Sequence, residues 1–168
     1  MTEGVLFVEV QRFNQWWLRG LMGLVCVPPL WGIYYQVILG KPFGNKPASD
    51  HALYILAALL LFLAFFFLRI AKLETWITKE GMDVRFFPFH ITARHYFWGD
   101  IDKVIVRNYS PIGEYGGWGL KSGSGGDTYN VSGEQGIQLV FKSGRKLLVG
   151  TNKPQEAANV LAIIKQDQ

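Results

Sequence analysis

The residues best suited to chemistry lie in the glycine-rich stretch from Gly113 to Gly126. A P-loop needs Gly-Lys-Ser/Thr after four spacer residues, so that backbone amides surround the phosphate and the lysine contacts it. Here Lys121-Ser122 follows Leu120 instead of a glycine. We therefore interpret this stretch as a surface loop with tight turns rather than as a nucleotide site.

Within this loop the sequence EYGGWG combines a carboxylate, two aromatic side chains and three glycines. Function concentrates in loops held by a rigid scaffold, so this segment is the predicted place of contact with a ligand or partner. The predicted contact residues are Glu114, Tyr115, Gly116, Gly117, Trp118 and Gly119.

Other reactive side chains lack partners at useful spacing. His90 and His95 are five residues apart in a strand-like region, which places them on opposite faces, and no third metal ligand is near them in sequence. The serines lack the nucleophile-elbow context, and no His or Asp partner can be identified for them. The sequence thus predicts no catalytic residue, no metal site, no cofactor and no enzymatic activity; an enzyme acting on a membrane substrate stays open as a third reading.

The element that organises the rest of the chain is the apolar stretch from His51 to Ile70. No charged residue, Pro or Gly occurs between Ala52 and Leu68, and a second uncharged stretch runs from Gly20 to Gly40. About 20 helical residues cross a bilayer core. We expect a two-helix transmembrane hairpin over residues 16–70, with spans at about 17–39 and 51–70, and a kink at Pro28-Pro29.

The residues that flank these spans predict their placement in the membrane. Six cationic residues lie on the side of the termini against Lys41 and Lys46 in the connecting loop, which favours cytoplasmic termini. Small residues in the spans (Gly20, Gly23, Ala57, Ala58 and Ala64) would allow close helix contact, which leaves a homo-oligomer open. The predicted membrane-interface residues are Trp16, Trp17, Arg19, Arg69 and Lys72.

The segments on either side of the spans read differently. Residues 1–15 are expected to be an interfacial segment, although the alternation of Leu6, Val8 and Val10 with Phe7, Glu9 and Gln11 also permits a short strand. Residues 71–168 hold short alternating runs that predict about seven strands in meander order, of which the hairpin around Ser143-Gly144 is the clearest. An amphipathic helix over 153–166 follows, so we expect a small antiparallel barrel with this helix against one open end.

Charge and cysteine content narrow the class of partner. Residues 71–168 carry 12 Lys/Arg against 10 Asp/Glu, a balance that gives no electrostatic footprint for nucleic acid. Cys26 is the sole cysteine, so an intrachain disulfide cannot form, which fits a reducing compartment.

Several short strings resemble bacterial membrane proteins with a pleckstrin-homology-like (PH-like) domain, a group largely of unknown function. The resemblance covers about Leu73 to Lys165, and EYGGWG is its most specific element. The other strings are Tyr96-Phe-Trp98 with Asp100-Ile101, Tyr109-Ser-Pro111, Tyr129-Asn-Val131, Gly136 to Phe141 and Gly150-Thr151.

The resemblance implies a PH-like fold and a membrane anchor, but no reaction. We expect a non-enzymatic binding or scaffolding module in the bacterial inner membrane, which presents its β domain to an unidentified protein partner in the cytoplasm. The contact surface would be the loop described above or a sheet edge that accepts an extended peptide. The alternative is a sensor of the membrane surface and its anionic lipids.

Overall fold

The computed structural model describes residues 4–123 and 125–166 of the chain. Residues 1–3, Ser124 and residues 167–168 lie outside the described residues, so the predicted segment 1–15, the glycine-rich loop and the predicted domain 71–168 are each described in part. The described chain divides into two compact units: a helical unit over Phe13–Ile70, and a β unit made of the residues up to Arg12 and from Ala71 onward.

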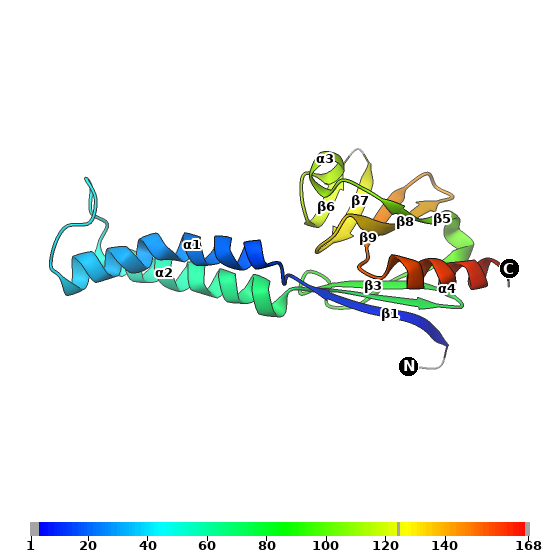
Figure 1. Ribbon diagram of the computed structural model, residues 1–168, viewed down its shortest axis with the longest axis horizontal. Helices are drawn as coiled ribbons and strands as arrows, with labels where there is room; N and C mark the ends of the chain where they lie inside the picture. The colour runs from blue at the N-terminus through cyan, green and yellow to red at the C-terminus, as the bar shows by residue number, and fades with distance from the viewer. Residues whose placement is uncertain (1–3, 124, 167–168) are drawn as a thin grey trace. The chain divides into compact units, whose positions relative to one another are not determined.

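The helical unit is an antiparallel pair in which each helix ends in a π turn (Figure 1). Its first helix runs through Pro28 and Pro29 without interruption. Ser49 caps the second helix by accepting a hydrogen bond from the Ala52 backbone N–H. The elements are α1 (Trp16–Ile33), η1 (Tyr34–Ile38), α2 (Asp50–Phe65) and η2 (Phe66–Ile70).

The two helices of this unit pack together at small residues. A Cβ atom at Gly32 would lie 3.1 Å from the Phe43 ring and 3.3 Å from Leu53, and Ala57 is buried. At Gly20 and Gly23 a Cβ atom would meet nothing within 4 Å, so these two glycines do not form the contact that their size would allow.

The β unit contains two sheets, and in Figure 1 its C-terminal helix runs beside them. Sheet one has the order β1-β2-β3-β4, and sheet two has the order β5-β8-β9-β7-β6. The elements are β1 (Val5–Arg12), β2 (Lys72–Thr78), β3 (Gly81–Phe87), β4 (Arg94–Phe97), η3 (Trp98–Asp100), β5 (Ile101–Asn108), α3 (Pro111–Tyr115), β6 (Gly119–Gly123), β7 (Gly126–Asn130), β8 (Gln135–Phe141), β9 (Lys146–Gly150) and α4 (Pro154–Gln166).

The expectation of one closed antiparallel barrel in meander order is wrong. The described strands form two separate sheets, and β7 pairs with β9 in parallel, whereas the other strand pairs are antiparallel. Alternating hydrophobicity shows which residues form strands but carries no information on which strand lies beside which. The hairpin around Ser143-Gly144 is confirmed as β8 and β9.

The sequence allowed either an interfacial segment or a short strand near the N-terminus. Val5–Arg12 forms a strand, β1, which belongs to the β unit. It pairs with β2 from Val5 opposite Thr78 to Arg12 opposite Lys72. The structure therefore differs from the expected boundaries, because the helical unit is inserted between two paired strands instead of following a separate N-terminal segment. The predicted C-terminal helix is present as α4, with Ala157, Leu161 and Ile164 buried.

Strand β1 also joins sheet one to the end of sheet two. The Glu9 carboxylate accepts hydrogen bonds from the Thr151 hydroxyl (2.6 Å) and the Asn152 backbone N–H (2.7 Å). The Gln11 side-chain amide donates to the Gly150 carbonyl at 2.6 Å. The buried face of this strand thus carries Phe7, Glu9 and Gln11, and the apolar side chains Leu6, Val8 and Val10 are exposed.

The parallel contact of β7 with β9 requires a glycine at the start of β7. A Cβ atom at Gly126, which has φ of +102°, would lie 2.4 Å from the Lys146 carbonyl oxygen. We expect Gly126→Ala to lower the free energy of unfolding by about 2 kcal/mol, because both the backbone strain and the overlap must be relieved. Thermal unfolding of the detergent-solubilised protein measures this.

The matched control is Gly123→Ala, at the residue paired with Gly126 in the same hairpin. Its Cβ atom would meet nothing within 4 Å, so its unfolding temperature should stay close to that of the wild type. Equal effects of the two substitutions would contradict the proposed role of the close β7–β9 approach.

Candidate functional site

The predicted contact segment begins in the short helix α3, which is held in place by reciprocal capping. The Ser110 hydroxyl accepts a hydrogen bond from the Gly113 backbone N–H, and the Glu114 carboxylate accepts one from the Ser110 backbone N–H at 2.9 Å. Arg107 of β5 holds Glu114 through two contacts, of 2.8 and 3.2 Å. This ion pair fixes α3 onto sheet two, where the sequence predicted a simple turn.

Tyr115 and the two glycines after it end this helix. The Tyr115 ring is buried edge-on against Tyr109, with ring centroids 6.0 Å apart. Gly116 has φ of +68°, and its backbone N–H donates to the Ile112 carbonyl, which is the αL type of helix C-cap; the Gly117 N–H donates to the Pro111 carbonyl. Tyr115, Gly116 and Gly117 therefore have structural roles in the fold.

Trp118 differs from its neighbours because its ring borders open space. The indole N–H donates to the Gly133 carbonyl at 3.3 Å, and the ring lies beside an open groove of about 630 Å³ that Asn108, Gln135 and Asn152 also line. After Trp118 the chain enters β6 at Gly119, whose N–H donates to the Asn130 side chain. The structure thus brings the six predicted residues together on one supported turn, with Trp118 beside a groove.

Two apolar side chains that flank the predicted contact residues are exposed. Ile112 of α3 has a relative exposure of 68%, and Leu120 of β6 has 43%. The predicted contact surface therefore combines a rigid backbone with exposed apolar groups.

The predicted membrane-interface residues lie at the chain ends of the helical unit. Trp16, Trp17 and Arg19 belong to the first turn of α1, and Trp16 is 84% exposed. Arg69 is in the last turn of η2. Lys72 begins β2 instead, where its ammonium pairs with Glu74 at 2.7 Å.

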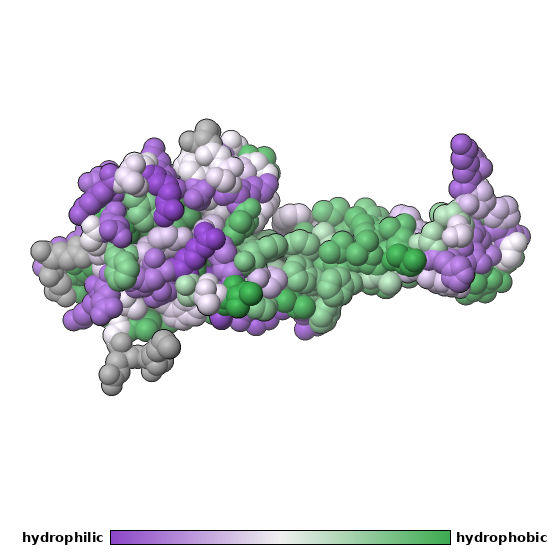
Figure 2. Space-filling model, turned by 180° about the vertical axis from the view of Figure 1, so that it is seen from behind, coloured by the Kyte–Doolittle hydropathy of each residue, from purple (hydrophilic) through white to green (hydrophobic). Residues whose placement is uncertain are grey.

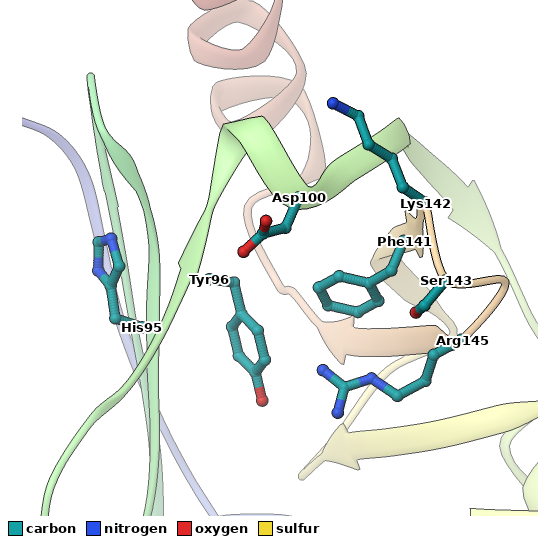
Figure 3. A pocket seen from close by; sticks show the side chains of 7 residues that line it. All are labelled: His95, Tyr96, Asp100, Phe141, Lys142, Ser143 and Arg145. Atoms are coloured by element: carbon teal, nitrogen blue, oxygen red, sulfur yellow. The ribbon is translucent and has the colours of Figure 1, made fainter.

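Sequence reasoning missed a second groove, of about 440 Å³, in the β unit (Figure 3). The Arg145 guanidinium lies over the Phe141 ring, 4.4 Å from its centroid, and 5.9 Å from the Tyr96 ring centroid. Asp100 of η3 lies across from Arg145, and the turn residues Lys142 and Ser143 complete the lining together with His95.

The floor of this groove is firmly held. Burial and its interaction with Tyr129 raise the pKa of the Tyr96 hydroxyl above its usual value, so Tyr96 stays neutral. The Asp100 carbonyl accepts a hydrogen bond from the Lys142 backbone N–H at 2.9 Å, which ties η3 to the turn between β8 and β9. The sequence did locate this turn, but it gave no signal that Tyr96 and Asp100 lie beside it.

His90, His95 and Ser122 each form a hydrogen bond with a different partner. The His90 Nδ1 accepts from the Phe86 backbone N–H, and His95 Nδ1 lies 2.8 Å from an Asp83 oxygen. The Ser122 hydroxyl donates to Asp127. Among residues 4–123 and 125–166, no group of three or more His, Cys, Asp or Glu side chains could hold a metal ion.

We compared the chain with known proteins. No protein-family model, curated protein or solved structure matches the chain.

The Arg107–Glu114 pair makes a prediction about acid stability. Its hydrogen bonds from Arg107 and from the Ser110 backbone hold the pKa of Glu114 below its ordinary value of 4.5. The stabilisation is therefore present above that value and is lost as the pH falls through the lower pKa of the folded state. We expect Glu114→Gln to cost about 0.5–1 kcal/mol near pH 7, a modest value because the pair is partly exposed.

Thermal unfolding from pH 7 to pH 3 checks this, and the difference between wild type and variant should shrink below about pH 4. Glu134→Gln serves as the control, since the Glu134 carboxylate has no ion-pair partner in the described part of the chain. A difference that persists unchanged at pH 3 would rule out the ion pair as its cause.

Proposed function

We propose that this protein is a membrane-anchored, non-enzymatic binding module. In this proposal the helical unit spans a bacterial inner membrane, and the β unit, which we take to be PH-like on the resemblance described above, meets a protein partner in the cytoplasm.

The composition of the helical unit supports a membrane anchor. Its two apolar helices, Trp16–Ile38 and Asp50–Ile70, have 23 and 21 residues, enough to rise roughly 30–35 Å. Only 17% and 11% of their apolar windows is buried, whereas a core helix of a soluble protein would be mostly buried. Figure 2 shows hydrophobic side chains covering the helical pair, with hydrophilic ones at the connecting loop. Lipid would cover this surface without further protein.

The insertion of the helices between paired strands is the observation that carries the proposal. Arg12, at the end of β1, lies opposite Lys72, at the start of β2. Since the chain leaves the β unit and returns to it at one end of one strand pair, two spans return it to the side from which it left. The β unit then stays on one face of the bilayer, and the six-to-two excess of cationic residues favours the cytoplasmic face.

Anchoring in the membrane would strengthen the binding of a partner to such a module. A partner held at the same membrane meets the β unit at a raised effective concentration, so a weak contact suffices. The segment around α3 is the favoured contact surface, because the apolar side chains of Ile112 and Leu120 are exposed there, Trp118 borders the open groove, and α3 is capped at both ends. The edge strand β1, with Leu6, Val8 and Val10 exposed, is the other surface that could accept an extended peptide.

The lipid-sensor alternative has less support. Lys72 and Arg85 both pair with Glu74, and these hydrogen bonds hold the pKa of Glu74 below its usual value even though burial acts to raise it. The Glu74 carboxylate offsets one of these two positive charges, which weakens their attraction for anionic headgroups. An oligomer of the anchor is compatible with either function.

Co-purification from detergent tests the proposed function. We expect a stoichiometric protein partner with the wild-type chain, and recovery reduced about tenfold for Ile112→Ser, because loss of one central apolar contact has effects of this size. Ile163→Ser is the control: Ile163 on α4 is also an exposed isoleucine, at 54% against 68% for Ile112. Purification of the chain alone from every extract, or equal loss with both variants, would count against the proposal.

A further inference from the structure

The groove of Figure 3 holds an arginine that is positioned but not neutralised. Stacking on Phe141 and the neighbouring Tyr96 ring restrains the guanidinium of Arg145. Within residues 4–123 and 125–166, no carboxylate lies within ion-pair distance of it. A guanidinium restrained beside these two rings keeps its planar set of donors available for a carboxylate.

The opposite wall of the groove carries the complementary charge. In Figure 3 the Asp100 carboxylate extends toward the Tyr96 ring from one side of Phe141, and the Arg145 guanidinium extends toward it from the other. Among the described residues these two groups form no ion pair with each other, although the Lys142 backbone N–H, which donates to the Asp100 carbonyl, ties η3 to the β8–β9 turn. The Asp100 carboxylate and the Arg145 guanidinium therefore face the same space without forming an ion pair.

The remaining polar groups of the groove do not converge on this space. Figure 3 shows the Lys142 side chain pointing away from the aromatic floor and the His95 ring on the other side of its strand, where it contacts Asp83. A phosphate or other purely anionic ligand would thus meet Arg145 together with the repulsion of Asp100. A ligand that carries one positive and one negative group satisfies both walls.

We propose that this groove binds a small zwitterion of the amino-acid class. The ligand carboxylate accepts hydrogen bonds from Arg145, and its ammonium group donates to Asp100. The hydrocarbon between the two charges lies against the Tyr96 ring. The volume of about 440 Å³ is within the range of small-molecule sites and suits a free amino acid or a compound of similar size.

This site is distinct from the partner surface proposed above, which lies on α3 and β6. A membrane-anchored module with both surfaces would bind its partner with the groove empty or filled. The binding of the zwitterion can be measured without knowledge of the partner, so each proposal can fail alone.

A series of linear ω-amino acids tests the groove, because chain length sets the distance between the two charges. Glycine, β-alanine, 4-aminobutanoate and 6-aminohexanoate are titrated into the full-length protein in detergent, and binding is followed by calorimetry and ligand-observed NMR. We expect saturable binding with an optimum at one length. Butanoate and butylamine carry one charge each. They should bind more weakly by a factor of about ten or more, since each loses one charge-assisted contact.

Paired variants assign the binding to the two walls. Arg145→Gln and Asp100→Asn should each weaken binding of the best member about tenfold or more, and Arg145→Lys should only partly restore it, since lysine lacks the planar donor set. The controls are Lys146→Gln and Asp102→Asn, at exposed neighbours that do not line this groove. Thermal unfolding confirms that all variants are folded.

The titrations and the variants give different results if the groove binds a zwitterion and if it does not. Length-dependent binding that is lost in the two groove variants and kept in the two controls supports the site. No binding by any member of the series, binding that follows the anion alone, or equal loss in the control variants overturns it.

Discussion

The structure depends on the pairing of β1 with β2 across the inserted helical unit. This pairing brings Arg12 and Lys72 together although the whole of Phe13–Ile70 lies between them in the chain. Closing so long a loop costs entropy, which grows only slowly with loop length, and a run of strand hydrogen bonds offsets it. The same strand reaches across to sheet two through Glu9 and Gln11, so β1 ties together both sheets and the start of α4.

Polar groups in the interior give this arrangement its register. Glu9 and Gln11 are each at most 5% exposed. Each forms a hydrogen bond with a residue near the C-terminal end of the sequence, Asn152 and Gly150 respectively. A shift of β1 by one residue would bury Val8 and Val10 but would leave the Asn152 N–H and the Gly150 carbonyl without these partners. The observed register buries the Phe7 ring together with Glu9 and Gln11 and keeps their hydrogen bonds to the segment from Gly150 to Asn152.

The sequence predicted the elements well and their arrangement poorly, for physical reasons. The two long apolar helices, the β8–β9 hairpin and α4 follow from local periodicity, which depends on neighbouring residues alone. The separation into two sheets follows from long-range choices such as the parallel pairing of β7 with β9. β1 could be recognised as a possible strand, but its partner lay beyond the spans, and its buried face carries Glu9 and Gln11, which local pattern assigns to solvent.

The candidate sites divide in the same way. The EYGGWG segment stands out in the sequence because caps, glycines and aromatic residues are adjacent, although most of its members have structural roles: Tyr115 is buried and Gly116 has a positive φ. The Arg145 groove could not be found, because Tyr96, Asp100 and Arg145 come from separate elements. One surface can be read from a single stretch of chain, and the other exists only after folding.

Excision of the helical unit tests whether these helices anchor a β unit that folds through the pairing of β1 with β2. In this variant Arg12 is joined to Ala71 through a short Asn-Gly turn, so that β1 and β2 become an ordinary hairpin. We expect the full-length chain to sediment with membranes and to need detergent for extraction, whereas the excised protein stays in the supernatant and unfolds cooperatively. A full-length chain that remains in the supernatant without detergent, or an excised protein that fails to fold, would contradict it.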